Sequence, residues 1–310
     1  MRLKRLFAAR NMTKSSGLLL IDKAQGVTSH DVVARVRKVL DERSVGHAGT
    51  LDPMATGLLI LGVGTATRLL RFATGEQKTY TGRVKFGVAT DSLDADGEVV
   101  HTAEVPDLTA SQVNEIAATC LGAQQQIPPM VSAIRQGGRR LHSLARQGIE
   151  VERDARAIEV FEYSLEPTND PSVWEFVVRV SPGTYVRVLL ADLAEKLGTV
   201  GHLIALRRIQ SGSHGLEGAL TLEQLSEAVE SGREVLQPPK AFTTGLVGIT
   251  LTDEEILKVR MGQRLAREIE GAEYEVAVHN ENGDFVAILR RSRDLWKPEI
   301  VLDGAHGPDQ

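Results

Sequence analysis

Residues 46–57 of the chain read GHAGTLDPMATG, a stretch with three glycines and one proline that carries one imidazole, His47, and one carboxylate, Asp52. Apolar segments flank it. Residues 58–63 (LLILGV) lie between glycines, which predicts a buried strand or a short helix. Residues 31–40 place valines at helical spacing and predict an amphipathic helix, with Thr28 or Ser29 as its N-cap. The sequence therefore predicts a glycine-rich loop that presents an acid and an imidazole between two buried elements.

The remaining segments predict a mixture of strands and helices. Alternate residues in 78–87, Tyr80 among them, fall on one face, which is the period of a strand. Residues 17–21 and 174–180 are further predicted strands, residues 111–121 are a predicted helix, and residues 186–197 are expected to begin extended and turn helical. Because strands and helices do not alternate strictly, the sequence predicts an α+β fold rather than a doubly wound sheet.

A boundary is predicted in the Pro- and Gly-rich residues 237–248 (QPPKAFTTGLVG). Beyond it, two predicted strands flank Asn282-Gly283, a strong hairpin signal. We expect a catalytic domain over residues 17–245 and a small β-rich domain over residues 250–310. The basic residues 1–16 are predicted to form a disordered leader.

Charge is distributed unevenly along the chain. The net charge is −5, but residues 1–80 carry 13 Lys/Arg against 6 Asp/Glu, whereas residues 253–310 carry 8 against 13. This asymmetry favours a basic working surface with an acidic appendage. Charges that are merely scattered over solvated faces are the alternative, and charge alone does not separate the two.

Composition excludes several classes of protein. Cys120 is the only cysteine, which excludes a disulfide framework and favours a reducing, cytoplasmic compartment. No apolar run approaches the roughly 20 residues that span a membrane. The chain contains no GxxxxGK[ST], HExxH, GxSxG or GxGxxG motif, so we expect neither a metal nor a cofactor.

Two acidic features then remain to be interpreted. Asp52 precedes Pro53, and such a pair often only initiates a turn. With no metal or cofactor motif nearby, the chemistry open to this carboxylate is nucleophilic or general-base catalysis. Residues 91–97 contain three aspartates and suggest a calcium loop, but the best register begins with Ser92 and ends with Ala103 instead of a glutamate. An acidic turn is the favoured interpretation there.

Basic and aromatic residues suggest a nucleic-acid substrate. Residues 124–148 contain Pro and Gly pairs and carry several arginines, whose planar guanidinium groups suit phosphate: Arg135, Arg139, Arg140 and Arg146. We expect an RNA-contacting segment over about residues 127–156. Tyr185 and Arg187 are two residues apart in SPGTYVRV, so on a strand they would share a face. An aromatic ring for a base, an arginine for an anion and a nearby acid would suit chemistry on a nucleobase.

Several motifs in a fixed order resemble the TruB family of tRNA pseudouridine synthases. They run from Gly17 to Arg208: GLLLIDKAQGVTSHDVV, VGHAGTLDPMATGLLILGVGTATR, KTYTGRVKFGVATDSLDADGE, PPMVSAIRQGGRRLHSLARQGI, SPGTYVRVLLADLAEKLG and HLIALRR. The resemblance implies a pseudouridine synthase fold with a mixed, largely antiparallel central sheet, and a C-terminal domain of the PUA type. It also implies isomerisation of the T-loop uridine at tRNA position 55, without cofactor.

The resemblance assigns roles to individual residues. Asp52 matches the catalytic aspartate, and His47 a histidine that helps hold the flipped-out nucleotide. Tyr80 matches the tyrosine that stacks on the target uracil. Tyr185 matches a substrate-contacting tyrosine and Arg187 the arginine that pairs with the aspartate. Leu206, in LRR, matches an apolar residue of the base pocket, and Arg139 and Arg140 are expected to contact the RNA backbone.

The chain departs from the family's usual residues in segments expected to contact RNA: Ala24, Val131, Arg135 and His142. Two other interpretations remain open. One is a related RNA-guided synthase that acts on ribosomal RNA within a multiprotein particle, and the other is a non-catalytic tRNA-binding or folding module. The TruB resemblance instead predicts a monomer that acts on the tRNA T stem-loop without an obligate protein partner.

Overall fold

The computed structural model describes residues 16–130, 135–136, 139–140 and 151–302. The leader predicted over residues 1–16 lies outside this part of the chain, except for Ser16. Contacts divide the chain into two compact units. Unit 1 comprises Met1–Asp52, Leu58–Gly75 and Leu216–Gln310, and unit 2 comprises Pro53–Gly57 and Glu76–Gly215. The domain limits predicted from the sequence stay predictions.

The first part of unit 1 is a small sheet with a helix. Its elements are β1 (Gly17–Lys23), α2 (Ser29–Leu40), β2 (Val45–Ala48) and β3 (Thr56–Val63). Strand β3 lies between β1 and β2, and β2 runs antiparallel to it. Helix α2 begins after Thr28, which forms a capping box with Asp31, and this agrees with one of the two caps expected from the sequence.

Alternate residues of β1 and β3 are buried in two different hydrophobic clusters. Leu19, Leu59 and Leu61 pack with the apolar face of α2 and with α7 (Leu222–Glu230). Leu18 and Ile60, on the opposite face, belong to a second cluster. A strand that is buried on both faces has a continuous apolar sequence. For this reason LLILGV shows no alternation, and its pattern does not distinguish a strand from a short helix.

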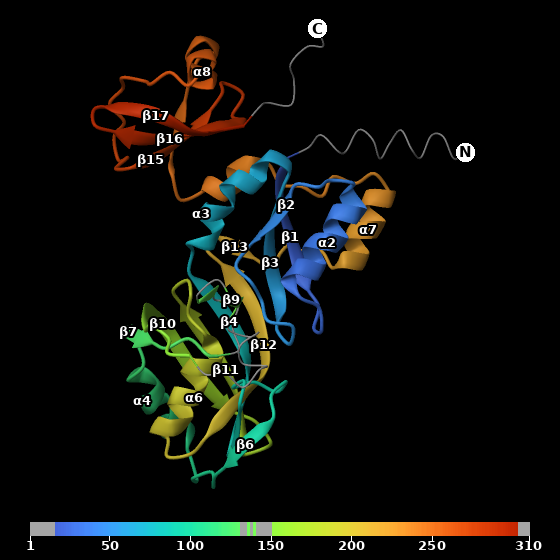
Figure 1. The fold of residues 1–310 in the computed structure, drawn as a ribbon, viewed down its shortest axis with the longest axis vertical. Coiled ribbons are helices and arrows are strands. Elements are labelled where there is room, and N and C mark those ends of the chain that lie inside the picture. Colours follow the sequence, from blue (N-terminus) through green and yellow to red (C-terminus); the bar gives the residue numbers. More distant parts are fainter. Residues whose placement is uncertain (1–15, 131–134, 137–138, 141–150, 303–310) are drawn as a thin grey trace. The chain divides into compact units, whose positions relative to one another are not determined.

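The C-terminal part of unit 1 is a four-stranded sheet in the order β14-β15-β16-β17 (Figure 1). Its strands are β14 (Val247–Thr250), β15 (Glu275–His279), β16 (Phe285–Ser292) and β17 (Leu295–Val301). The predicted hairpin is confirmed: β15 and β16 pair antiparallel, and Gly283 adopts φ 80° in the turn. Only glycine adopts such a backbone conformation without strain.

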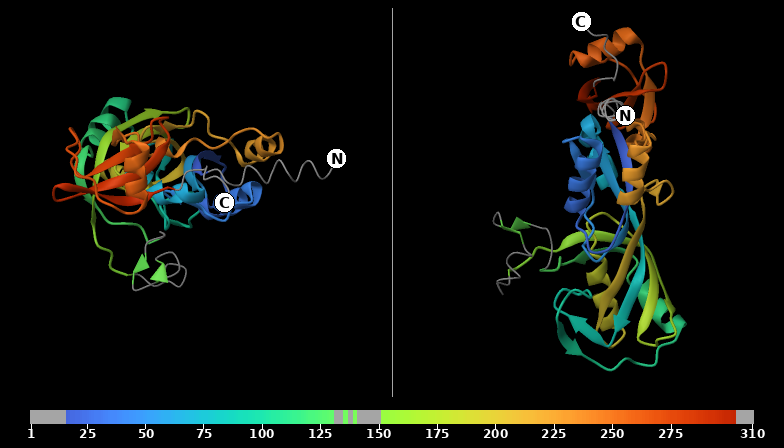
Figure 2. Two further views of the ribbon diagram at one scale, coloured as in Figure 1. Left: turned by 90° about the horizontal axis from the view of Figure 1, so that it is seen from above. Right: turned by 90° about the vertical axis from the view of Figure 1, so that its right-hand side faces the viewer.

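Both faces of this C-terminal sheet are buried. Helix α8 (Asp253–Arg260) lies beside the strands of this sheet (Figure 2). Its residues Ile256 and Val259 are buried in a cluster with one face of the sheet. Residues of the other face, such as Ile288 and Ile300, share the second cluster with Leu18 and Ile60. Two arginines from η1 (Gly64–Leu69) and α3 (Leu70–Thr74) add polar contacts to this packing. Arg68 of η1 donates to the carbonyl of Val301 at 2.6 Å, and Arg71 of α3 forms an ion pair with Glu275 at 2.7 Å.

Unit 2 is built on a sheet in the order β12-β4-β11-β10-β7. The strands are β4 (Lys78–Phe86), β7 (Gly122–Gln126), β10 (Arg156–Pro167), β11 (Val173–Val180) and β12 (Gly201–Ser211), and all neighbouring pairs are antiparallel. Residues Thr56 and Gly57, at the start of β3, pair parallel with Arg207 and Arg208 of β12. The sheet is therefore mixed and largely antiparallel, as predicted.

Smaller elements complete unit 2. They are β5 (Val88–Thr90), β6 (Val99–Thr102), α4 (Ala110–Ala118), β8 (Arg135–Gln136), β9 (Arg139–Arg140), α6 (Val186–Lys196) and β13 (His214–Gly215). Helix α4 packs against β10 and α6 against β12 (Figure 1). Within the described part of the chain, no helix is long and apolar enough to cross a bilayer.

One element was predicted wrongly. Residues 186–197 were expected to begin extended, but α6 is helical from Val186. The chain turns at Gly183, which adopts φ 84°, and Tyr185 is the last extended residue, with φ −96° and ψ 106°. Valine and threonine in GTYVRV favour a strand locally, whereas burial of the apolar face of α6 in the tertiary structure decides for the helix.

Candidate active site

The loop that carries His47 and Asp52 leaves and rejoins the sheet within a few residues. His47 lies in β2 opposite Leu61 of β3, and Ala48 is the last residue of β2. The chain then turns at Gly49, with φ 81°, and re-enters the sheet at Thr56. Sheet pairing therefore fixes His47, whereas Asp52 lies in the connecting loop.

The first turn of α2 contacts His47 and the residue before Asp52. The ring of His30 meets that of His47 edge to face, with centroids 5.4 Å apart. The hydroxyl of Ser29 hydrogen bonds to the backbone of Leu51, the residue before Asp52. Neither contact was expected, because Ser29 was considered only as a helix cap. Its signal in the sequence is its place in the motif GVTSHD.

In unit 2, Tyr80 and Leu206 lie on one face of the sheet. Tyr80 of β4 is opposite Arg208 of β12, and Gly82 is opposite Leu206, so Tyr80 and Leu206 are diagonal neighbours. Both are buried, with 8% and 9% of their surface exposed. The structure thus brings together the two residues assigned to the base pocket.

Two glycines allow close packing around these residues. A Cβ on Gly82 would collide with the carbonyl of Ala205 and lie 2.7 Å from the ring of Phe176. Gly57 adopts φ 98°, and a Cβ there would collide with the backbone of Arg208. At Gly57 the chain that follows Asp52 therefore approaches β12 at a distance that only glycine permits.

Tyr185 and Arg187 do not share a strand face, contrary to the prediction. Tyr185 precedes α6 and Arg187 lies in its first turn. The side chain of Gln126 holds the backbone of Tyr185: its amide oxygen accepts from the Tyr185 N–H at 2.8 Å, and its amide nitrogen donates to the Tyr185 carbonyl at 3.1 Å. The guanidinium of Arg156 lies 5.6 Å from the centre of the Tyr185 ring, within cation–π range.

Arg187 forms a buried ion pair with Asp94. The Nη1–Oδ2 distance is 3.0 Å, and the two side chains are 4% and 6% exposed. The other carboxylate oxygen of Asp94 accepts from the hydroxyl of Ser92 and from the backbone N–H of Asp96. The acidic residues 91–97, interpreted from the sequence only as a turn, thus include a structural partner of Arg187. The predicted pairing of Arg187 with Asp52 stays a prediction.

Lys78, on the same face of β4 as Tyr80, is a buried cation. Burial, together with the neighbouring guanidinium of Arg208, lowers the pKa of Lys78 to about 8. Its ammonium donates to the carbonyl of Glu76 at 2.7 Å. The buried face that carries Tyr80 therefore also carries a buried amino group.

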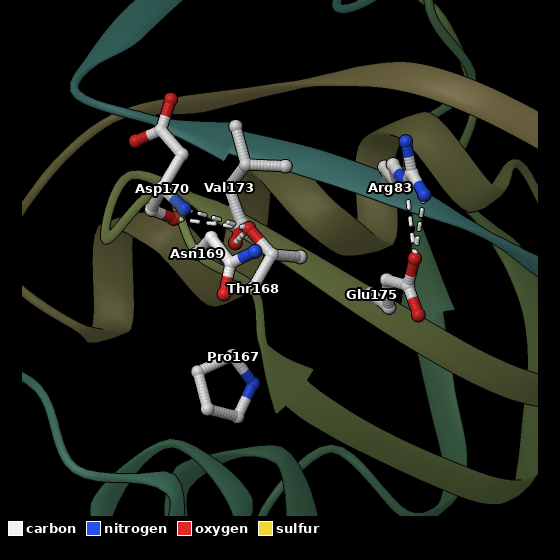
Figure 3. Close-up of a pocket in the computed structure, with 7 residues that line it drawn as sticks. All are labelled: Arg83, Pro167, Thr168, Asn169, Asp170, Val173 and Glu175. Atoms are coloured by element: carbon white, nitrogen blue, oxygen red, sulfur yellow. Dashed lines mark hydrogen bonds and ion pairs between the residues drawn. The ribbon is translucent and has the colours of Figure 1, made fainter.

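A cavity of about 580 Å³ in unit 2 is lined by residues including Arg83, Asp170 and Glu175 (Figure 3). Arg83 and Glu175 form an exposed ion pair there at 2.8 Å. Because side chains alternate along β4, Arg83 lies on the opposite face of the sheet from Tyr80. None of the predicted site residues lines this cavity, so it is not a candidate for the base pocket.

The predicted RNA-contacting arginines are only partly within the described part of the chain. The backbones of Arg139 and Arg140 form β9, which pairs with β8. Their side chains lie outside the described residues. Their contacts with RNA stay a prediction.

Solved structures identify the class of fold. A chain in "Crystal Structure of a Cbf5-Nop10-Gar1 Complex" matches with a TM-score of 0.71 at 22% identity, over 95% of this chain and 85% of that one. A chain in "Structure of H/ACA RNP bound to a substrate RNA containing 2'-deoxyuridine" matches with a TM-score of 0.70, over 93% of this chain and 85% of that one, also at 22% identity. The fold is that of the pseudouridine synthases.

Sequence comparison is more specific. A family model described as "TruB family pseudouridylate synthase (N terminal domain)" matches residues 37–186, and one described as "tRNA pseudouridylate synthase B C-terminal domain" matches residues 187–240. The tRNA pseudouridine synthase B of Arthrobacter sp. (strain FB24) is 40% identical over 93% of this chain and 96% of its own length. The tRNA pseudouridine synthase B of Streptococcus pneumoniae serotype 2 (strain D39 / NCTC 7466) is 40% identical over 93% of this chain and 99% of its own length. The chain belongs to the TruB family of pseudouridine synthases.

Proposed function

We propose that this chain isomerises the T-loop uridine at position 55 of tRNA to pseudouridine. The observation that carries the proposal is the similarity over nearly the whole chain to proteins named tRNA pseudouridine synthase B. The net reaction breaks the bond from N1 of the base to C1′ of the ribose and forms a bond from C5 to C1′. The proton leaves C5 and a proton is taken up at N1, so substrate and product have the same composition.

The target base is stacked in a folded RNA and has to be extruded before its glycosidic bond can react. Unstacking costs a few kcal/mol, and stacking on an aromatic side chain, worth about 1–3 kcal/mol per base, offsets this. Tyr80 is the proposed stacking residue, because its ring lies on the buried face beside Leu206. The buried Lys78 on that face favours an anionic substrate.

Asp52 is the proposed nucleophile. An unactivated carboxylate contributes mainly through its position, and positioning can supply much of the rate enhancement of an enzyme. His47, Tyr185 and Arg187 are proposed to contact or orient the nucleotide. We propose that Asp94 keeps Arg187 in place in the absence of substrate, since their ion pair is already formed in the protein alone.

The test is an assay of the purified chain with an unmodified tRNA transcript, in which pseudouridine formation releases tritium from [5-³H]uridine. A transcript with cytidine at position 55 is the substrate control. Modification of position 55 by the chain alone supports a synthase without an obligate partner. Absence of modification by the folded chain contradicts the proposal. The interpretation as an RNA-guided enzyme predicts activity only with a guide RNA and partner proteins.

Substitution of the nucleophile gives the second arm of the test. Asp52→Asn preserves size and removes the charge, so turnover is expected to vanish while tRNA binding survives. Asp170→Asn is the matched control, because Asp170 is exposed and lines the cavity on the other face of the sheet. Turnover of Asp52→Asn within tenfold of the wild-type value would refute the assignment.

A further inference from the structure

The first turn of α2 holds the peptide backbone immediately before Asp52. The hydroxyl of Ser29 accepts a hydrogen bond from the N–H of Leu51 at 2.9 Å and donates one to the carbonyl of Leu51 at 3.2 Å. One side chain thus satisfies both backbone groups of a residue 22 positions away in the sequence. Ser29 is 1% exposed and Leu51 is 3% exposed, so water does not compete strongly for these bonds.

The helix turn that carries Ser29 is itself anchored. Thr28, the residue before Ser29, caps α2, and its capping box with Asp31 fixes the geometry of the first turn. Along the helix, Val32 and Val36 are fully buried in the cluster that includes Leu59 and β1. Ser29 therefore reaches Leu51 from a helix whose position is set by the core of unit 1.

Leu51 lies in a part of the loop that sheet pairing does not hold. Ala48 ends the pairing of β2 with β3, and Gly49 then turns with a positive φ, so the sheet no longer restrains the backbone at Leu51. A peptide group is planar, and the plane that contains the Leu51 carbonyl also contains the N–H and Cα of Asp52. A bond that fixes the orientation of the Leu51 carbonyl therefore also fixes the starting point of the Asp52 side chain.

We propose that Ser29 is a positioning residue that orients Asp52 through the backbone of Leu51. The role in catalysis rests on the proposed function of Asp52, but the positioning of the loop does not. A misplacement of about 1 Å can lower the rate of an enzyme about 100-fold, so a hydroxyl remote from the substrate can affect turnover. The hydroxyl acts on the rate of the chemical step and leaves RNA affinity unchanged, because Ser29 is buried beneath the loop.

Hydrogen–deuterium exchange of the whole protein tests the contact without reference to activity. In Ser29→Ala the Leu51 N–H is left in a buried site without its acceptor, and we expect its exchange to accelerate about 5- to 30-fold. The acceleration is expected in peptides that cover residues 46–55 and not in peptides from α7. Ser226→Ala is the matched control, since the hydroxyl of Ser226 donates to the Leu222 carbonyl within α7 at 2.9 Å.

Single-turnover kinetics on a tRNA transcript test the consequence. We expect Ser29→Ala to lower the rate constant at least tenfold with a tRNA Kd within twofold of wild type. Ser29→Thr, which keeps the hydroxyl, is expected to recover most of the rate, whereas Ser29→Cys, which keeps the size but bonds weakly, is expected to resemble Ala. Ser226→Ala is expected to match wild type in rate and Kd.

The outcomes are distinguishable. Unchanged exchange over residues 46–55 in folded Ser29→Ala or Ser29→Cys would overturn the positioning role. Accelerated exchange with a rate constant within twofold of wild type would show that Ser29 supports only the structure of the loop, and would overturn its part in catalysis. A wild-type protein that is inactive on tRNA contradicts the proposed function, and the exchange result then decides the role of Ser29 alone.

Discussion

The buried pair of Arg187 and Asp94 allows a quantitative test of the candidate site. The structure places Asp94 at 3.0 Å from the guanidinium of Arg187. The pairing of Arg187 with Asp52 that the resemblance implies stays a prediction. We consider Asp94→Asn, Arg187→Met and the double variant. Asp94→Asn retains a side-chain oxygen for Ser92 and Asp96 and removes the charge, so the cycle reports mainly on the ion pair.

The magnitude follows from burial. Breaking an ion pair whose side chains are only 4% and 6% exposed typically destabilises a protein by about 3–5 kcal/mol. The double variant removes both charges and is expected to be less destabilised than the sum of the single variants. The coupling energy from the double-mutant cycle is therefore expected to be about 2 kcal/mol or more.

An exposed pair in the same unit provides the control. Arg83 and Glu175 lie on adjacent strands with an N–O distance of 2.8 Å, but their side chains are 56% and 55% exposed. Solvent screening limits the coupling of such pairs to at most about 1 kcal/mol. Urea denaturation of both cycles at neutral pH and fixed salt gives the two coupling energies. A coupling at Arg187–Asp94 that does not exceed the control would refute Asp94 as the structural partner of Arg187.

Three further predictions concern the pocket, the RNA and pH. Tyr80→Phe should bind tRNA nearly as well as wild type and Tyr80→Ala should bind worse, because stacking contributes about 1–3 kcal/mol per base. Wild-type tRNA binding and turnover in both variants would exclude Tyr80 from the pocket. Arg139→Ala with Arg140→Ala should weaken tRNA binding and flatten its salt dependence by up to about two phosphate contacts. Arg291→Ala with Arg293→Ala, in β16 and in the turn that follows it, should change affinity and salt dependence less. The reverse order, in a titration at several salt concentrations, would place the main RNA contacts in the acidic C-terminal part of the chain. Lys78 has a pKa of about 8 in the folded protein and about 10.4 in the unfolded chain. Between these values the unfolded chain binds more protons, so the free energy of unfolding should rise with pH, by up to about 3 kcal/mol. Urea denaturation from pH 7 to 10 should show this rise in wild type and lose it in Lys78→Met, and parallel curves for the two proteins would contradict it.

Patterns confined to a few consecutive residues were sufficient to predict several elements. The cap at Thr28 and the valines of residues 31–40 specify α2, because capping and helical periodicity act within one or two turns. The alternation around Tyr80 specifies β4, and Asn282-Gly283 specifies the hairpin of β15 and β16, since its turn needs a residue with positive φ. The matching motifs also identified the family, because several motifs in one order are more specific than any single pattern.

The partners of the site residues were decided only by the tertiary structure. Ser29 and Leu51 are 22 residues apart, Gln126 and Tyr185 are 59 apart, and Arg187 and Asp94 are 93 apart. No local pattern marks such pairs, because each forms only when separate elements pack together. The same reason explains the error at α6, where GTYVRV has the local preference of a strand and the buried face of a helix. The sequence by itself determined the motifs and the elements that carry them, and packing decided which side chains hold those motifs in place.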